Sequence, residues 1–217
     1  VPPSLIRTAT DYFDKAIVTR VYGSTEVPVT TVGSPQPGDT DHAADTDGQP
    51  GIADVRLVDG EIRARGPQML TGYLHEGKPA AAFDADGYFC TGDLGAWVDE
   101  HYLVVTGRAK DLIIRNGENI APKEIEDLLI TEPNIADIAI VGVPDARTGE
   151  RACAVIVPGD GTRADVDQLR RVLADHGVAK FKAPEEVAIW DALPKNDAGK
   201  VLKHRIRAQL MEERACQ

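Results

Sequence analysis

Residues 21–26, with the sequence VYGSTE, gather in six positions the residue types that can hold a nucleotide. The ring of Tyr22 can stack on a base, and Gly23, at the expected end of a strand, lets the backbone approach a ligand closely. Thr25 can donate a hydrogen bond to a phosphate, and the carboxylate of Glu26 can hold a magnesium ion. A polar turn after a buried strand uses the same residues, so this segment alone leaves both interpretations open.

A second segment, YFCTGDLG at residues 88–95, places Asp93 in what reads as a tight Thr-Gly-Asp turn. A carboxylate there can accept hydrogen bonds from two adjacent hydroxyl groups, such as those of a ribose. The alternative is an Asx-type turn, in which the side chain of Asp93 satisfies only the backbone.

A third segment, VTGRAKDLIIRNGENIAPKEIE at residues 105–126, ends a strand at the Gly-Arg pair of Arg108 and continues through Lys110. Its Asn-Gly dipeptide, which ends at Gly117, predicts a β-hairpin turn. A proline-led helix follows, and its Glu124 and Glu126 are best explained as partners of the helix dipole.

A fourth segment, LPKNDAGKVLKHR at residues 193–205, puts Lys200 directly after a glycine, in a turn-like stretch that opens a basic helix. Between Lys195 and Arg207, five Lys or Arg residues stand against the single acidic residue Asp197, which suits a small anion. The alternative is a solvated lysine at a helix start, which is unfavourable because the N-terminal end of a helix repels cations.

The whole chain is acidic, with 217 residues, a formal net charge of −11 and 42% hydrophobic residues. This composition fits one or two globular domains and argues against general nucleic-acid binding, which needs clustered Lys and Arg. The three cysteines lack a C-x-x-C pair and are interpreted as reduced thiols of a cytoplasmic protein. No apolar run reaches membrane-spanning length, and we expect no membrane span.

The secondary structure that the sequence predicts around these segments differs before and after residue 107. Residues 1–107 predict a proline-led helix, an apolar strand ending at Gly23, a surface loop over residues 33–50, and then four short strands up to residue 107. Residues 108–217 predict a hairpin, a helix, two apolar strands, a helix, a strand and a closing helix from residue 200. We therefore expect a mixed α/β (α+β) protein with its boundary at Arg108.

Together, in this order, the segments resemble those of the adenylate-forming enzymes: acyl-CoA synthetases, luciferases and the adenylation domains of peptide synthetases. The matching segments are YGSTE, GEIRARGPQMLTGYL, DGYFCTGD, GRAKDLIIRNGENIAPKEIE and LPKNDAGKVLKHR, which span residues 21–207. The resemblance implies that residues 1–107 are the β-rich tail of the large AMP-binding domain. Residues 108–217 would be the small, mobile C-terminal domain.

The resemblance also implies a role for each matching residue. Tyr22 would lie against adenine, Thr25 would contact phosphate, and Gly23 and Ser24 would also be nucleotide-binding. Asp93 would take the ribose hydroxyls, Arg108 would reach ribose or phosphate, and Lys200 would bridge the carboxylate substrate and the α-phosphate. Lys200, Thr25 and Glu26 would be catalytic, and Glu26 would hold Mg²⁺. Lys110 matches the hinge between the two domains, and Gly117 matches the hairpin that lines the channel for the pantetheine of CoA.

The implied function is that of an acyl-CoA synthetase in fatty-acid or related metabolism. Such an enzyme activates a carboxylic acid with ATP and Mg²⁺ and transfers it to CoA by domain alternation. The sequence lacks the Ser/Thr/Gly-rich phosphate loop and the first large subdomain of the family, so we expect a fragment of a longer enzyme that is inactive alone. The alternatives are an adenylation enzyme that loads a carrier protein and a non-catalytic nucleotide-binding or interaction module. The acid itself and the oligomeric state are not indicated.

Overall fold

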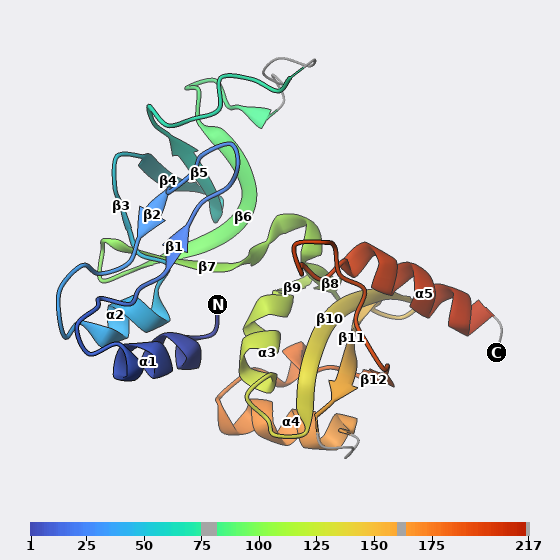
Figure 1. Ribbon diagram of the computed structural model, residues 1–217. Helices are drawn as coiled ribbons and strands as arrows, with labels where there is room; N and C mark the ends of the chain where they lie inside the picture. Colours follow the sequence, from blue (N-terminus) through green and yellow to red (C-terminus); the bar gives the residue numbers. More distant parts are fainter. Residues whose placement is uncertain (75–81, 160–163, 216–217) are drawn as a thin grey trace. The chain divides into compact units, whose positions relative to one another are not determined.

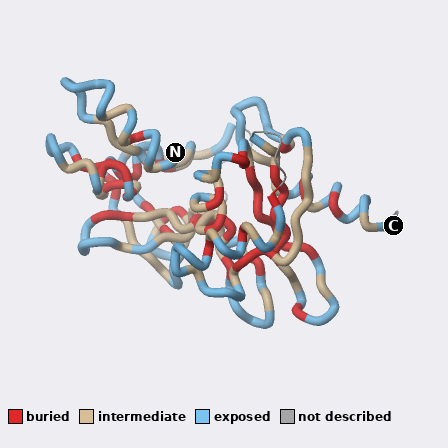
Figure 2. The backbone as a smooth tube through the Cα atoms, turned by 90° about the horizontal axis from the view of Figure 1, so that it is seen from below, coloured by how far each residue is buried: buried red, intermediate tan, exposed pale blue. Residues whose placement is uncertain are grey.

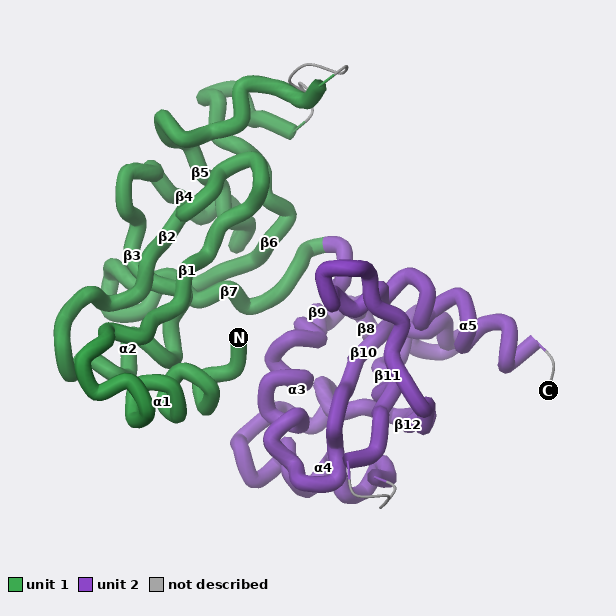
Figure 3. Tube along the Cα trace, viewed as in Figure 1, with its two compact units in different colours: residues 1–109 green, residues 110–217 purple. Residues whose placement is uncertain are grey.

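The structure, a computed structural model, describes residues 1–74, 82–159 and 164–215. The chain forms two compact units, residues 1–109 and 110–217, which Figure 3 shows in separate colours. The division falls within the short 3-10 turn η2 (Ala109–Asp111). Each unit has its own hydrophobic core, and Figure 2 shows the buried stretches in red between exposed turns in pale blue.

Unit 1 begins with α1 (Pro3–Tyr12), the proline-led helix that the sequence predicted. An antiparallel sheet of three two-residue strands has the order β1-β2-β3, with β1 (Val21–Tyr22), β2 (Thr31–Val32) and β3 (Gln49–Pro50). The prediction of a plain loop over residues 33–50 is wrong, because this stretch contains α2 (Thr40–Asp45) and β3. The side chain of Asp39 accepts a hydrogen bond from the backbone N–H of His42 and so caps α2.

The second sheet of unit 1 contains the four predicted strands in the antiparallel order β4-β5-β6-β7. They are β4 (Asp54–Val58), β5 (Glu61–Arg65), β6 (Phe89–Val98) and β7 (Tyr102–Arg108). Leu103 of β7 donates its backbone N–H to the carbonyl of Gly48 and accepts one from Asp47. These two bonds join the start of β3 to β7, and so connect the two sheets of unit 1.

Unit 2 follows the element order that the sequence predicted. Its elements are β8 (Ile113–Arg115), β9 (Glu118–Ile120), α3 (Pro122–Leu129), β10 (Ile135–Asp145), β11 (Gly149–Pro158), α4 (Val166–Asp175), η3 (Lys180–Lys182), β12 (Glu186–Ile189) and α5 (Lys203–Ala215). The sheet order is β10-β11-β8-β9, and β12 pairs with β11 in parallel. Asn116 and Gly117 both have positive φ, at 52° and 83°, which confirms the predicted two-residue hairpin turn between β8 and β9.

The long β10–β11 pair is buried on both faces, which explains its nearly continuous apolar sequence. Ile138 and Ile140 pack with α3 and α4 on one face, whereas Ala139, Val141 and Val143 pack with α5 on the other. Figure 1 shows α3 and α5 on opposite sides of β10. The side chains of Ile206 and Leu210 hold α5 in place.

The closing helix starts later than the sequence suggested. Residues 195–201 form a closed turn in which the backbones of Lys195 and Val201 form an antiparallel β-bridge. Helix α5 begins only at Lys203. Leu202 donates its backbone N–H to the carbonyl of Pro194 at 2.8 Å, which closes the base of the turn. Lys200 therefore lies in a loop before the helix, and the alternative of a lysine at the helix start is wrong for this residue.

Two further predictions concern the cysteines and the membrane span. Cys90 and Cys153 are free thiols, and burial raises the pKa of Cys153 to about 12, whereas Cys216 lies outside the described residues. None of the helices in the described ranges is long and apolar enough to cross a membrane.

The link between the two sheets of unit 1 depends on Gly48. Its φ is +98°, and an added Cβ would lie 2.2 Å from the carbonyl carbon of Val32. Gly38 has a similar φ of +86°, but an added Cβ there would meet nothing within 4 Å. We expect Gly38→Ala to lower the free energy of unfolding by about 1–2 kcal/mol through backbone strain alone. Gly48→Ala should cost about 2–5 kcal/mol, because overpacking adds to the strain.

Urea denaturation measures both losses. Trp97 lies in β6, so its fluorescence in a Trp190→Phe background reports on unit 1 alone. Equal losses in the two variants would contradict the prediction and show that Val32 moves aside.

Candidate functional site

Asp93 is the residue that the sequence predicted to bind a ribose, and two other predicted residues contact it. It is only 7% exposed. The hydroxyl of Tyr22 donates a hydrogen bond to Oδ2 of Asp93 at 2.9 Å, and Nε of Arg108 donates to Oδ1 at 2.7 Å. Arg108 is the direct partner of Asp93 in the β6–β7 register, whereas Tyr22 comes from β1. A carboxylate this buried needs such partners. The fold thus brings three predicted residues together.

The local backbone around Asp93 differs from both sequence interpretations. Asp93 lies inside β6 rather than in a tight turn, at a point where the β5–β6 register shifts and Gly92 has a φ of +68°. Its carboxylate bonds side chains, so the Asx-turn alternative is wrong. The hydroxyl of Thr91 takes the local role instead, because it accepts the backbone N–H of Asp93 at 3.0 Å.

The hydroxyl of Tyr22 stays protonated and so remains a hydrogen-bond donor to Asp93. Burial is the largest influence and raises the pKa of the Tyr22 hydroxyl far above its usual range, and the negative charge of Asp93 raises it further. The hydrogen bond with Thr91 opposes the shift without reversing it. Tyr22 therefore keeps its proton at any physiological pH and continues to donate to Asp93.

Gly23 and Ser24 shape the turn that follows β1. The hydroxyl of Ser24 accepts the backbone N–H groups of Glu26 and Val27, each at 3.2 Å, as in the polar turn that the sequence offered as an alternative. An added Cβ at Gly23 would lie 2.7 Å from the backbone nitrogen of Val29. The chain's own backbone therefore accounts for this glycine, without the close approach of a ligand.

Thr25 and Glu26 extend from the same turn, with Thr25 exposed and Glu26 half-buried. The hydroxyl of Tyr73 donates a hydrogen bond to Oε1 of Glu26 at 2.6 Å. This bond is the main reason why the pKa of Glu26 lies below its ordinary value; burial opposes the shift, and Ser24 and the backbone N–H of Glu26 support it. An ionised carboxylate is the donor that Mg²⁺ requires, and Mg²⁺ commonly binds through one or two carboxylates together with substrate phosphates and water. Among the described residues no three His, Cys, Asp or Glu side chains gather to hold an ion, so Glu26 fits Mg²⁺ only as one ligand beside phosphate and water.

The predicted residues of unit 2 are exposed. Lys200 donates its backbone N–H to the side chain of Asn196 at 2.8 Å, and its carbonyl accepts the N–H of Asn196 at 3.0 Å. Gly199 provides the positive φ, +79°, that the turn requires. Within the described part of unit 2, no acceptor bonds the ammonium group of Lys200, which lies in a closed loop next to the Lys195–Val201 pairing.

Lys110 and Gly117 are also exposed but lie on different elements. Lys110 is in η2 and is the first residue of unit 2, whereas Gly117 is at the tip of the β8–β9 hairpin. The backbone N–H of Asn116 donates to the carbonyl of Thr148, and the side chain of Glu150 accepts the N–H of Ile114. These bonds attach the hairpin to the β10–β11 connection and to β11.

Sequence analysis missed the partners of Glu124 and Glu126. Glu124 is in the first turn of α3, as expected for a dipole partner, but it also forms an ion pair with Lys182 at 2.7 Å. Glu126 forms an ion pair with Lys203 at 2.6 Å and accepts the backbone N–H of Ile140 at 2.7 Å. Glu126 lies beyond the first turn of α3, where the effect of the helix dipole has faded, so the helix-dipole interpretation does not hold for it. No local sequence pattern could have revealed partners so distant along the chain.

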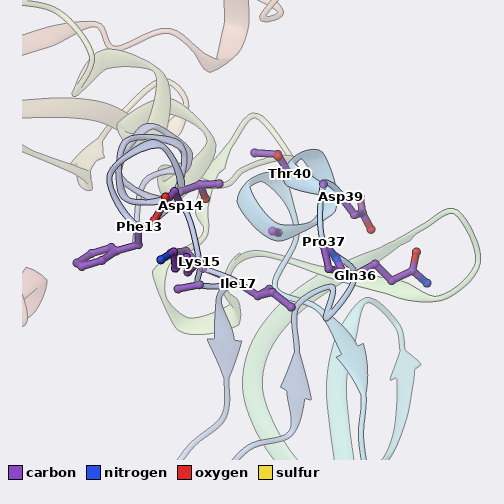
Figure 4. A pocket seen from close by; sticks show the side chains of 13 residues that line it. Phe13, Asp14, Lys15, Ile17, Gln36, Pro37, Asp39 and Thr40 are labelled. Carbon is purple, nitrogen blue, oxygen red and sulfur yellow. The ribbon is translucent and has the colours of Figure 1, made fainter.

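A pocket of about 360 Å³ lies elsewhere in unit 1, between the end of α1 and the loop that leads into α2. Figure 4 shows Lys15 and Ile17 on one side of it and Gln36, Pro37 and Asp39 on the other. Its lining contains none of the sequence-predicted site residues. The pocket is therefore separate from the Tyr22–Asp93–Arg108 group, and we assign it no ligand.

Comparison with known proteins identifies the family of this chain. A family model described as the AMP-binding enzyme C-terminal domain matches residues 124–200. A CoA ligase for a methyl-dioxo-octahydroindenyl propanoate from Mycobacterium tuberculosis is 40% identical over 212 residues, which cover 95% of this chain and 41% of that protein. The chain belongs to the adenylate-forming enzymes.

Two further members of the superfamily resemble the chain over most of its length. A vibriobactin-specific 2,3-dihydroxybenzoate–AMP ligase from Vibrio cholerae is 38% identical over 191 residues, which cover 87% of this chain and 35% of that protein. The crystal structure of ATP-bound MatB from Rhodopseudomonas palustris is 33% identical with a TM-score of 0.78, and the match covers 96% of this chain and 43% of that one. The chain thus spans about two fifths of the length of the relatives it matches.

The hydrogen bond between Tyr73 and Glu26 leads to a prediction about the pKa of Glu26. Tyr73→Phe should raise the pKa of Glu26 toward its ordinary value, because the largest stabilising influence on the carboxylate is removed. A depressed pKa contributes stability above the ordinary pKa and loses it as the pH falls through the folded pKa, so the variant should also lose less stability on acidification.

An NMR titration of the Glu26 carboxyl carbon measures the shift directly. Tyr12→Phe is the control, since Tyr12 is 79% exposed on α1. An unchanged pKa in Tyr73→Phe would assign the shift to Ser24 and the backbone instead.

Proposed function

We propose that this chain is part of an ATP-dependent acyl-CoA synthetase that activates a carboxylic acid, fatty or related, and transfers it to CoA. The observation that carries the proposal is the group of Tyr22, Asp93 and Arg108, which places a buried, oriented carboxylate beside the Ser24–Glu26 turn. The resemblance to a CoA ligase over 95% of the chain supports CoA as the acceptor of the acyl group.

In this proposal Asp93 binds the ribose of ATP. An ionised carboxylate has about four acceptor positions, and Tyr22 and Arg108 occupy one on each oxygen. One position on each oxygen remains, which matches the two adjacent hydroxyl groups of a ribose. Tyr22 would contribute its ring to the adenine, and Arg108, whose side chain is 36% exposed, could reach the ribose or a phosphate.

The reaction begins when a carboxylate oxygen attacks the α-phosphorus of ATP. A new P–O bond forms, the bond to pyrophosphate breaks, and the acyl-adenylate remains. Two anions must approach each other in this step, so a cation placed at the α-phosphate stabilises the transition state. We assign that role to Lys200, whose exposed ammonium group is available for it. Glu26 would hold Mg²⁺, which neutralises phosphate charge, and Thr25 would donate to a phosphate.

In the second half-reaction the thiolate of CoA attacks the acyl carbon, and AMP leaves. We propose that Lys110 is the hinge through which unit 2 exchanges Lys200 for the β8–β9 hairpin, with Gly117 lining the pantetheine channel. The tip of that hairpin is exposed, which leaves it available to a ligand. The function belongs to a longer enzyme in a cytoplasmic setting, and the 217 residues alone would lack the β,γ-phosphate loop and be inactive.

Two other functions stay open. The 2,3-dihydroxybenzoate–AMP ligase among the relatives supports an adenylation enzyme that passes its product to a carrier protein. Release of acyl-CoA rather than an acylated carrier distinguishes the two. A non-catalytic nucleotide-binding or interaction module is the third possibility, and it predicts nucleotide binding without either half-reaction.

Asp93→Asn tests the nucleotide site. Charge-assisted hydrogen bonds are worth about 1.5–3 kcal/mol each, so loss of the charge should raise the Kd for AMP by at least about tenfold. The matched control is Asp54→Asn, because Asp54 also pairs with a tyrosine and an arginine, Tyr88 and Arg65, in the same sheet. Calorimetric titration of AMP into the 217-residue chain measures both. Equal affinities in wild type and Asp93→Asn would remove Asp93 from the site.

Lys200 and Lys110 should affect opposite half-reactions in the enzyme that contains this chain. Lys200→Ala should lower acyl-adenylate formation by about 10²-fold or more yet leave thioester formation from synthetic acyl-adenylate intact. Lys110→Pro should impair only thioester formation, because proline fixes the φ angle that a hinge must change. Single-turnover assays separate the two steps. Equal effects of Lys200→Ala on both would overturn the assignment.

A further inference from the structure

The loop that carries Lys200 is held at both of its stems by ion pairs. On the first stem, Lys195 pairs with Asp137 of β10 at 2.6 Å. On the second, Lys203, the first residue of α5, pairs with Glu126 of α3 at 2.6 Å. The two stems are also joined by the Lys195–Val201 pairing and by the bond from Leu202 to Pro194.

The second stem is the more strongly built of the two. The side chains of Lys203 and Glu126 are 17% and 20% exposed, whereas those of Lys195 and Asp137 are 44% and 27% exposed. An ion pair with little solvent is screened less and holds a more defined geometry than a pair in water. The Lys203–Glu126 pair is therefore the stronger of the two ionic anchors of the loop.

Glu126 itself lies on a rigid support. Its neighbours Ile125 and Leu129 are fully buried and fix α3 against the sheet. Oε1 of Glu126 also accepts the backbone N–H of Ile140. Because β10 is an edge strand, that N–H has no strand partner on its outer side. Glu126 of α3 thus contacts both the edge of β10 and the start of α5. Figure 1 shows α3 and α5 on opposite sides of β10.

The pair also resolves an electrostatic conflict at the start of α5. A cation at the first position of a helix is repelled by the partial positive charge of the helix N-terminus. Lys203 occupies this position, and the carboxylate of Glu126 offsets the repulsion. Without Glu126 this repulsion would be unopposed, and the end of the loop next to α5 would be held less firmly.

We infer that Glu126, acting through Lys203, is a positioning residue that sets the place of Lys200 for acyl-adenylate formation. Glu126 touches no substrate in this role; it fixes the backbone from which Lys200 extends. The inference rests on the proposed function for the role of Lys200, but the anchoring of the loop is a separate property and is measured separately. A displacement of about 1 Å in a catalytic group can lower a rate by about 10²-fold, so a loosened stem has a measurable effect.

The chain offers a matched control on the same helix. Glu124 pairs with Lys182 at 2.7 Å, two residues before Glu126, and its partner lies in η3 rather than beside the loop. Glu124→Gln and Glu126→Gln therefore make the same chemical change on α3, and only the second reaches the loop. The amide of Glu126→Gln keeps an oxygen acceptor for Ile140, so the variant removes the charge without removing that bond.

Hydrogen exchange on the 217-residue chain tests the anchor without any assay of activity. In Glu126→Gln and Lys203→Met, the amides of Lys200 and Leu202 should exchange about tenfold faster or more, because both donate within the loop. Glu124→Gln and the conservative Lys203→Arg should exchange as the wild type does. Unchanged exchange in Glu126→Gln and Lys203→Met would overturn the inference.

Single-turnover kinetics in the enzyme that contains the chain test the positioning role. Glu126→Gln should lower the rate of acyl-adenylate formation by about 10- to 100-fold, with the KM values for ATP and acid unchanged. Thioester formation from synthetic acyl-adenylate should be unaffected, and Lys203→Arg should retain the adenylation rate. The double variant Glu126→Gln/Lys203→Met should be no slower than either single variant, because both remove one interaction.

The outcomes separate this inference from the proposed function. Faster exchange with an unchanged adenylation rate would overturn the positioning role alone, provided that Lys200→Ala is defective. Equal slowing of both half-reactions in Glu126→Gln would also overturn it and leave a merely structural role. An active Lys200→Ala enzyme would overturn the proposed role of Lys200, and the positioning role with it, whatever the exchange rates show.

Discussion

A carboxylate can leave water in a folded protein only when charged or polar partners replace its hydration, and both units of this chain are built around that requirement. In unit 1, Asp93 is accommodated by Tyr22 and Arg108. In unit 2, Glu126 is accommodated by Lys203 and by the N–H of Ile140. Each carboxylate and its two partners come from three different elements. The carboxylate is therefore satisfied only when those elements have assembled, which makes the arrangement specific as well as stable.

Three of the groups that would contact ligands, Thr25, Lys200 and Gly117, are by contrast exposed. Thr25 lies in a turn held by Ser24, Lys200 lies in a loop with two anchored stems, and Gly117 lies on a hairpin attached to β11. Fixing a residue's backbone costs about 1–2 kcal/mol and burying a long side chain up to about 2 kcal/mol more. Because the backbone is already ordered by the fold, a ligand has to order only the side chain. Anchored stems with exposed tips reduce the entropy that binding must overcome.

The sequence predicted what depends on local pattern and missed what depends on distant partners. The β10–β11 pair, the Asn-Gly hairpin at Gly117 and the four strands of unit 1 were predicted because apolar runs and turn residues lie next to each other in the chain. The six-residue helix α2 was hidden among Pro, Gly and Asp residues typical of loops, since its start depends on one capping contact. The Thr-Gly-Asp segment and the family resemblance both indicated Asp93, but the bond from Tyr73 to Glu26 and the pair between Glu126 and Lys203 appear only when the chain is folded.

The location of the anchors has a consequence for a reaction in two steps. If Lys200 serves the first step and is withdrawn for the second, its position must be precise in one arrangement of the units and irrelevant in the other. An anchor that bridged the two units would have to break at each exchange, at a cost of several kcal/mol for a pair with little solvent. The Lys203–Glu126 and Lys195–Asp137 pairs lie wholly within unit 2, so they remain intact however that unit turns. In the proposed two-step reaction, anchors inside the moving unit, rather than at its boundary, would let the loop return to the same geometry in every cycle.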